Sequence, residues 1–235
     1  MRSILVVSAA SPAAFAAALT SDADALAIDL SMDDTERTRA AAVEMIAAAK
    51  AAGRKRLALI HPLASGLADA DLDAVMAAPP DGIILPDALG GRDIQHLGAK
   101  LAVREAENDL PDGSMKILPL VADSPAAIFE LGALVRATHR LIGIGRDEGL
   151  LAARLGLARA LQGEKPDPLR LARSLAVLAA AAAGAPAYDC AEPGEDDDFA
   201  RACALAARDG FSGKFALTPD QAKAINAAFD AVRTG

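Results

Sequence analysis

Short apolar runs alternate with longer segments of helical pattern along the whole chain. Each run is almost continuously apolar instead of alternating between apolar and polar residues, which is typical of strands in a parallel sheet covered on both faces. We predict eight strands, at Ser3 to Ser8, Ala25 to Leu30, Arg56 to His61, Gly82 to Pro86, Lys116 to Val121, Arg140 to Gly145, Pro186 to Cys190 and Gly213 to Leu217.

The segments between the runs carry signals for the starts and ends of helices. Ser11 followed by Pro12 is a typical helix start, and acidic residues from Asp33 to Glu36 suit the positive end of a helix dipole. Gly53 and Gly184 stand where helix C-caps are expected. Helices are therefore predicted after each strand.

Eight strand-helix units in 235 residues match the usual size of a closed (β/α)8 barrel. An open, doubly wound α/β sheet is the alternative, but the even spacing and the lack of an antiparallel segment favour closure. The sequence contains no linker, so we predict a single (β/α)8 (TIM) barrel domain over residues 1–235.

Composition and charge narrow the functional class. The chain has 24 Lys and Arg against 32 Asp and Glu, for a net charge of −8, and no basic face suited to nucleic acid. Its two cysteines, Cys190 and Cys203, are predicted to be buried thiols. The first apolar run, Ile4 to Val7, is too short for the core of a signal peptide, and no stretch suits a membrane span. A cytoplasmic protein that binds neither membrane nor nucleic acid is expected.

Polar residues gather where the predicted strands end. In a barrel the active site forms at the carboxyl ends of the strands. The polar residues there are Ser8, Asp29, Ser31, His61, Asp87, Asp123, Ser124, Arg146, Asp147, Glu148, Asp189, Thr218 and Asp220. Converging carboxylates repel one another unless a cation compensates, and such oxygen ligands suit Mg²⁺ or Mn²⁺. Arg146 is the candidate to bind the carboxylate of a small anionic substrate.

Structural roles explain some of these residues equally well. An aspartate after a strand often caps the next helix, which accounts for the run from Glu195 to Asp198 and is an alternative for Asp123 and Asp147. His61 is either an acid/base group or a structural histidine. Gly143 and Gly145 have the wrong spacing for a dinucleotide-binding loop.

Four stretches of the sequence are similar to motifs of one enzyme family. Residues 24–30 resemble DALILDLED, residues 81–86 resemble DGIMLPK, and residues 172–189 resemble ARS…AAGLPAID. Residues 210–221 resemble GFDGKLAIHPAQ most specifically. On these motifs the chain resembles the citrate lyase beta-subunit-like branch of the HpcH/HpaI aldolase family.

The resemblance implies a Mg²⁺-dependent barrel that cleaves or forms a carbon-carbon bond in a 3-hydroxy acid or its CoA thioester. The chain departs from the family at positions that carry the chemistry: the family's metal-binding glutamate aligns with Ala122, leaving Asp123 one position on. Its two anion-binding arginines also lack counterparts, since one aligns with Leu59 and the first loop has no basic residue. A CoA thioester carries several phosphates, so this usual substrate is not expected here.

Two hypotheses follow. In the first, the chain is a lyase or aldolase acting with Mg²⁺ or Mn²⁺ on a small hydroxy or oxo acid. Its metal ligands are Asp123, Asp147 and Glu148, and its catalytic residues are His61 as acid/base, Arg146 for a substrate carboxylate, and Asp29. In the second, the chain is a catalytically degenerate paralogue, a subunit or binding module beside an active homologue. The resemblance also implies a homo-oligomer.

Overall fold

The computed structural model describes residues 1–157 and 165–233. Its eight strands form a closed parallel barrel in which each strand pairs with the next along the chain and β8 pairs with β1. The strands are β1 (Ser3–Ser8), β2 (Ala25–Asp29), β3 (Arg56–Leu59), β4 (Gly82–Leu85), β5 (Lys116–Val121), β6 (Ile144–Arg146), β7 (Ala187–Asp189) and β8 (Gly213–Ala216). The predicted (β/α)8 barrel is confirmed.

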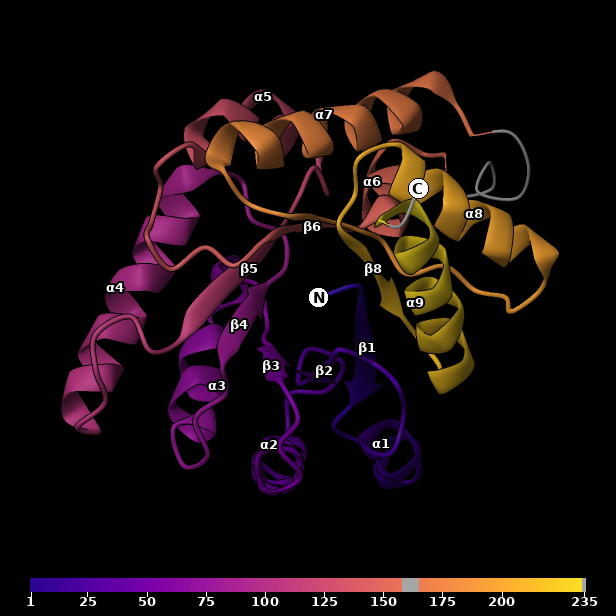
Figure 1. The fold of residues 1–235 in the computed structure, drawn as a ribbon. Coiled ribbons are helices and arrows are strands. Elements are labelled where there is room, and N and C mark those ends of the chain that lie inside the picture. The colour runs from indigo at the N-terminus through magenta and orange to yellow at the C-terminus, as the bar shows by residue number, and fades with distance from the viewer. Residues whose placement is uncertain (158–164, 234–235) are drawn as a thin grey trace.

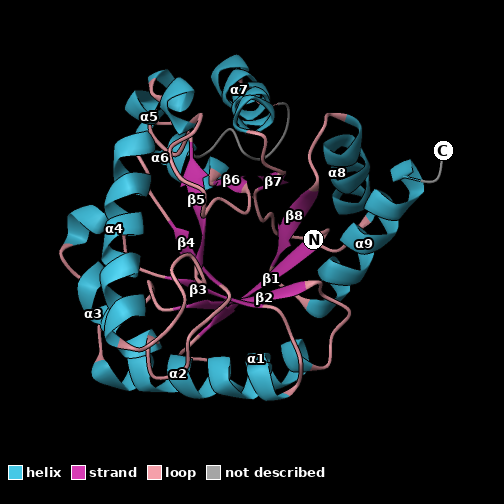
Figure 2. Cartoon of the chain, turned by 60° about the vertical axis from the view of Figure 1, so that its left-hand side comes forward, coloured by secondary structure: helices cyan, strands magenta, loops and turns pink. Residues whose placement is uncertain are grey.

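Helices surround the barrel (Figure 1 and Figure 2). They are α1 (Pro12–Leu19), α2 (Glu36–Ala51), α3 (Ala68–Val75), α4 (Gly91–Glu107), α5 (Pro125–Phe129), α6 (Glu148–Arg154), α7 (Asp167–Ala183), α8 (Asp197–Arg208) and α9 (Pro219–Arg233), with short 3-10 turns η1 (Leu63–Ser65) and η2 (Leu131–Leu134). No helix in these described residues is long and apolar enough to cross a membrane.

Two apolar layers hold the barrel together. The inner layer fills the barrel and includes Tyr188 and Phe215, whose rings meet edge to face at 6.5 Å between centroids. The outer layer lies between the strands and the helices and includes Ile28 and Ile144. Because side chains alternate across a strand, the residues next to an inner residue point outward.

The sixth strand begins later than predicted. Leu141 pairs with Ile117 in an isolated bridge, but regular pairing resumes with Gly145 opposite Leu120, so one extra residue lies between the two contacts. Gly143 lies in this interval, and a Cβ there would come within 2.3 Å of the Tyr188 ring. An extra residue of this kind works as a β-bulge, shifting which side chains point inward after it.

The helix starts follow the predicted signals in part. Ser124 accepts a hydrogen bond from the Ala127 N–H, and Gly184 ends α7 in the left-handed conformation. Ser11 precedes Pro12 but makes no capping hydrogen bond. The cap of α2 is Thr35, while Asp33 instead accepts a hydrogen bond from the Thr38 hydroxyl.

Candidate functional site

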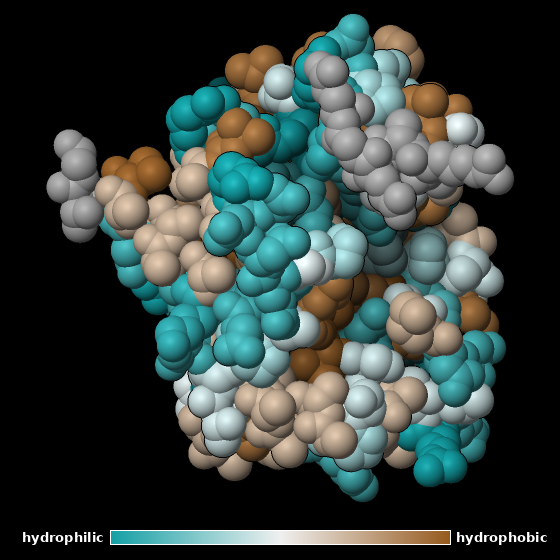
Figure 3. Space-filling view, turned by 90° about the vertical axis from the view of Figure 1, so that its right-hand side faces the viewer, coloured by the Kyte–Doolittle hydropathy of each residue, from teal (hydrophilic) through white to brown (hydrophobic). Residues whose placement is uncertain are grey.

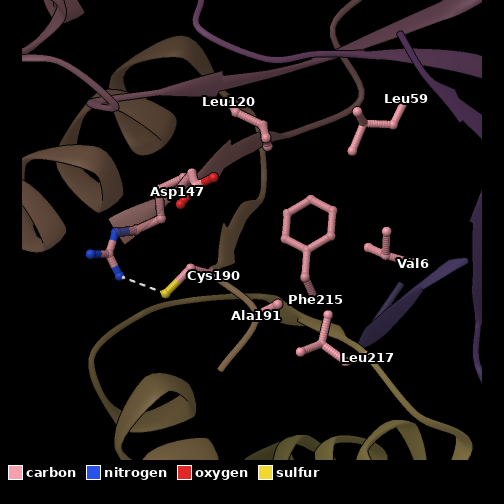
Figure 4. Close-up of a pocket in the computed structure, with 9 residues that line it drawn as sticks. Val6, Leu59, Leu120, Asp147, Cys190, Ala191, Phe215 and Leu217 are labelled. Atoms are coloured by element: carbon pink, nitrogen blue, oxygen red, sulfur yellow. Dashed lines mark hydrogen bonds between the residues drawn. The ribbon is translucent and has the colours of Figure 1, made fainter. Parts of the chain in front are cut away.

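A small chamber opens at the carboxyl ends of the strands. Its volume is about 150 Å³, and most of its wall is apolar. Arg146, Asp147 and Cys190 are its polar residues, and its other lining residues are Val6, Leu59, Leu120, Ala191, Phe215 and Leu217 (Figure 4). One face of the molecule likewise shows apolar surface recessed between hydrophilic side chains (Figure 3). The chamber lies at the end of the barrel where active sites of this fold form.

Asp147 presents a carboxylate to this chamber (Figure 4). It follows β6 and caps α6, since its Oδ1 accepts a hydrogen bond of 3.0 Å from the Leu150 N–H. No ion pair in the described part of the chain involves Asp147. The capping role expected from the sequence is therefore present, and the carboxylate still faces the chamber.

Asp123 lies buried directly behind Asp147. Its Oδ1 accepts from the Asp147 N–H at 3.0 Å and its Oδ2 from the Asp87 N–H at 3.3 Å, so one carboxyl connects the ends of β4, β5 and β6. Burial, together with repulsion from Asp147 and Asp87, raises the pKa of Asp123 to about 7. Neither carboxyl forms an ion pair within the described residues, and the nearby Arg154 guanidinium is paired with Asp87, so the two would gain from a bound positive charge.

Backbone strain accompanies this arrangement. Ala122 and Asp87 have positive φ angles of 60° and 53°, a conformation unfavourable for residues other than glycine. Both residues stand at the ends of strands joined by the Asp123 carboxyl. Strain of this kind persists where surrounding contacts impose it, often at functional sites.

A closed ring of six alternating charges forms the wall beside the chamber. The ring runs in the order Arg146, Glu148, Lys165, Glu192, Lys214 and Asp189, and returns to Arg146. The distances between successive charged atoms lie between 2.5 and 3.9 Å. With three cations and three anions, the ring is electrically neutral.

The alternation of side chains explains why the ring lies in the barrel wall. Tyr188 and Phe215 point into the barrel, so their neighbours Asp189 and Lys214 point outward. Arg146 is likewise buried, with its guanidinium bonded to Glu148 at 2.5 Å and to Asp189 at 2.6 Å. Arg146 is therefore already occupied by two carboxylates.

The pKa values in the ring reflect this pairing. Burial by itself would raise the pKa of Asp189, but the charges of Arg146, Lys214 and Arg173 outweigh it and hold the pKa well below its usual range. Burial opposes the charge of Lys165, yet Glu192 and Glu148 raise its pKa above the ordinary value. Asp189 and Lys165 therefore stay ionised throughout the neutral pH range.

One group of three potential metal ligands occurs in the described residues, and it lies at this ring. Ligand atoms of Glu148, Cys190 and Glu192 lie within 4.8 Å of one another. The Lys165 ammonium is already 2.6 Å from Glu148 and 2.7 Å from Glu192. Burial raises the pKa of the Cys190 thiol to about 11, which disfavours the thiolate that binds metals. This group therefore does not fit a divalent ion.

Asp29 and His61 lie at the ends of the neighbouring strands β2 and β3. The Oδ1 of Asp29 accepts from the backbone and hydroxyl of Ser31 at 2.8 and 2.7 Å, and burial raises the pKa of Asp29. The Nδ1 of His61 lies 2.7 Å from Oδ2 of Asp71, which is fully buried on α3 and also pairs with Arg39. Neither Asp29 nor His61 lines the chamber.

The structure thus divides the predicted site residues among three places. Asp147 lines the chamber with Asp123 buried behind it, Arg146 and Glu148 belong to the ring, of which Arg146 also borders the chamber, and Asp29 and His61 lie on the side of β2 and β3. Sequence reasoning missed the remaining partners of the ring and of His61, which are Lys165, Glu192, Lys214 and Asp71. A buried lysine in a strand, as at Lys214, is a signal that would have suggested a charged partner.

The closed barrel with a chamber at the carboxyl ends of its strands defines this chain as a (β/α)8 protein of the kind that supports many enzyme activities. The family model for HpcH/HpaI aldolase/citrate lyase matches residues 2–219, and the chain belongs to that family.

Solved structures share this fold. The citrate lyase beta subunit from Mycobacterium tuberculosis, complexed with oxaloacetate and magnesium, superposes with a TM-score of 0.77 at 22% identity, over 97% of this chain and 96% of that chain. RipC from Yersinia pestis superposes with a TM-score of 0.75 at 24% identity, over 97% and 94% of the two chains. A search of curated proteins finds no significant match.

Proposed function

We propose that this protein is a citrate lyase beta-subunit-like lyase or aldolase that acts with Mg²⁺ on a carbon-carbon bond of a small hydroxy or oxo acid. The observation that carries the proposal is the Asp147 carboxylate, which faces the chamber beside the buried carboxyl of Asp123. The Mycobacterium tuberculosis relative, with magnesium and oxaloacetate, supports the same chemistry.

The donor set at the chamber fits a hard divalent cation. Asp147 and Asp123 would hold the ion, since carboxylate oxygens suit Mg²⁺ and Mn²⁺ and each oxygen that accepts one N–H retains a further lone pair. Hydrogen bonds from backbone N–H groups would orient these ligands. Glu148 is left out of the set, because its carboxylate is held by Arg146 and Lys165.

When bound, a divalent ion supplies polarisation of the oxo or carboxylate end of the substrate and stabilises negative charge that develops there. The apolar wall of the chamber excludes water from the reacting carbons. We propose His61 as the acid/base for the part of a substrate that extends beyond the chamber toward β2 and β3, since His61 does not line the chamber: Asp71 holds its Nδ1, leaving Nε2 to exchange a proton, with Asp29 beside it. We assign no substrate contact to Arg146, because Glu148 and Asp189 occupy its guanidinium.

Metal binding tests this proposal directly. Calorimetry with Mg²⁺ and Mn²⁺ should detect one site in the wild type that is lost in Asp147→Ala and weakened in Asp123→Ala. Asp220→Ala is the matched control, because Asp220 is an exposed aspartate in the first turn of another helix. If the wild type binds neither ion at millimolar concentration, the metal-dependent lyase is excluded.

Proton exchange tests the chemistry. A lyase that forms an enolate should exchange the methyl protons of pyruvate in ²H₂O when Mg²⁺ is present, and Asp147→Ala should abolish the exchange. Proton NMR measures this without knowledge of the natural substrate. Metal binding without any exchange of pyruvate protons would contradict the catalytic part of the proposal.

The ring of charges favours a second candidate, a non-enzymatic subunit or binding module beside an active homologue. All three cations of the ring are paired, and Arg154, the next basic residue near the chamber, pairs with Asp87 at 2.6 Å. Because these basic residues are all paired with carboxylates, none of them is available to bind an anionic substrate. Absence of metal binding and of proton exchange, with a stable complex on co-purification with a homologue, would select this candidate.

A further inference from the structure

We propose that the chamber receives a short, apolar and uncharged end of the substrate, so that the protein acts on aliphatic monocarboxylic oxo or hydroxy acids in preference to dicarboxylates and phosphate-bearing thioesters. This inference rests on the proposed function and specifies its substrate class. Two observations support it: the apolar lining of the chamber, and the pairing of the nearby cations with carboxylates in the ring.

The lining of the chamber is complementary to a hydrocarbon group. Val6, Leu59, Leu120, Phe215 and Leu217 supply its walls from four different strands or strand ends. Figure 4 shows these side chains converging on one space, with the Asp147 carboxylate at its side. A substrate held at Asp147 through a cation would direct its remaining carbons among these apolar groups.

The volume of the chamber limits this end of the substrate to a few carbons. Its 150 Å³ lies well below the roughly 300–1,000 Å³ of pockets that enclose drug-sized ligands. Each methylene buried there should tighten binding about fourfold until the space is filled. A three-carbon acid would leave part of the chamber empty, and a long acyl chain would not fit.

The ring removes the counter-charges that a second anionic group would need. Arg146 contributes to the chamber wall but bonds two carboxylates, and Lys165 bridges two others. A second carboxylate in the chamber would thus be desolvated without a partner, which is unfavourable.

The groove next to the chamber is also unfavourable to anions. It has a volume of about 620 Å³ and shares Asp147, Cys190 and Ala191 with the chamber. Its other charged lining residues are Lys165, Glu148, Glu192, Asp196 and Asp198. With four further carboxylates against one ammonium, the groove would repel the phosphates of a long thioester.

Substrate-class binding can be measured with two series of probes. The first is pyruvate, 2-oxobutyrate, 2-oxopentanoate and oxaloacetate, each with Mg²⁺, measured by calorimetry and by exchange of the C3 protons. The second is the uncharged ketones 2-butanone, 2-pentanone and 2-hexanone without metal, measured by saturation-transfer NMR. The ketones report on the chamber alone, so their result is independent of metal binding and of catalysis.

A substitution in the chamber wall should reverse the preference for aliphatic monocarboxylic acids over dicarboxylates. Leu217→Arg places a cation at the mouth, at a residue that is 48% exposed and accommodates a longer side chain. Leu178→Arg is the control, since Leu178 is similarly exposed on α7 and does not line the chamber. Circular dichroism and thermal unfolding confirm that both variants are folded.

We expect 2-oxopentanoate to bind at least about tenfold more tightly than pyruvate, as two added methylenes imply, and oxaloacetate to bind more weakly than both. Leu217→Arg should weaken the ketones and strengthen oxaloacetate, and Leu178→Arg should change neither. Tighter binding of oxaloacetate than of 2-oxopentanoate in the wild type, or ketone affinity that does not depend on chain length, would overturn the inference. If the ketones bind as expected while Mg²⁺ does not, the proposed lyase function fails and the apolar chamber stands.

Discussion

The backbone N–H of Asp147 donates a hydrogen bond of 3.0 Å to Oδ1 of Asp123, so the residue that faces the chamber is held by the buried carboxyl behind it. A second N–H, that of Asp87, occupies the other oxygen of the same carboxyl. The ionisation of Asp123 therefore bears on the stability of three strand ends and on the affinity of the chamber for a cation.

Stability should fall as pH rises through the folded pKa of Asp123. That pKa is raised from 3.8 to about 7, so the neutral carboxyl favours folding. The contribution is fully present below pH 3.8 and is lost progressively as pH rises to about 7. Urea unfolding of the wild type and of Asp123→Asn from pH 4 to pH 8 should show a decline in the wild type that the variant lacks. Parallel profiles would contradict this, and saturating Mg²⁺ should suppress the decline.

The ring of charges should behave as a coupled unit. Lys165→Met leaves Glu148 and Glu192 facing each other without the ammonium, and we expect a loss of about 2 kcal/mol in the free energy of unfolding. Adding Glu192→Gln should recover part of this loss, giving a coupling energy of about 1 kcal/mol in a double-mutant cycle. Lys100 and Asp69, an exposed pair at 2.8 Å, provide the control cycle, for which we expect a coupling energy of about 0.3 kcal/mol. Strict additivity at Lys165 and Glu192 would show that the ring is not coupled.

Acid unfolding should depend on Glu105, at the opposite end of the barrel. Burial would raise its pKa, but Arg140 and the N–H groups of Met115 and Gly113 outweigh burial and lower the pKa from 4.5 to about 2. Its stabilisation is present above pH 4.5 and is lost as pH falls to about 2. Glu105→Gln should lower the free energy of unfolding by roughly 3 kcal/mol at pH 7. It should also make stability fall less steeply as the pH is lowered, as measured by circular dichroism. Metal binding should not change, because the site lies at the other end of the strands.

Closure of the barrel between β1 and β8 should depend on Gly213. A Cβ at this position would lie 2.3 Å from the backbone oxygen of Arg2, which cannot move without breaking the pairing of β1 with β8. Gly213→Ala should therefore cost about 3 kcal/mol or lead to insoluble protein. Gly132→Ala, with no atom within 4 Å of the new methyl, should remain near wild type in thermal unfolding.

The fold could be predicted from sequence because its signal is local. Continuous apolar runs mark the strands, and the observed bounds of seven of the eight agree with them within about two residues. The sixth differs, because pairing from Leu141 to Gly145 includes an extra residue that no apolar pattern reveals. With that shift, the Arg146 guanidinium lies in the barrel wall against Glu148 and Asp189, and the Asp147 carboxylate faces the chamber.

The site could be predicted only in part for the same reason. The predicted strand ends identified Asp123 and Asp147 as site residues. They did not show which side chains face the chamber, because a shift of one residue along a strand moves a side chain to the other face of the sheet. Partners in the ring come from distant segments that closure of the barrel brings together: Asp189 lies 43 residues from Arg146, and Lys165 lies just before α7, whereas its partner Glu148 begins α6. A lysine within an apolar strand, as at Lys214, signals that a charged partner is needed, but the sequence does not say which residue that partner is.

The neutrality of the ring has a kinetic consequence. A cleft with free cations attracts anionic ligands over a distance of about one Debye length. At this end of the barrel, an approaching anion instead meets the repulsion of a chain with net charge −8. Capture of a small acid should consequently be slow at low ionic strength and accelerate as salt screens the repulsion. This is the reverse of the salt dependence shown by electrostatically steered enzymes.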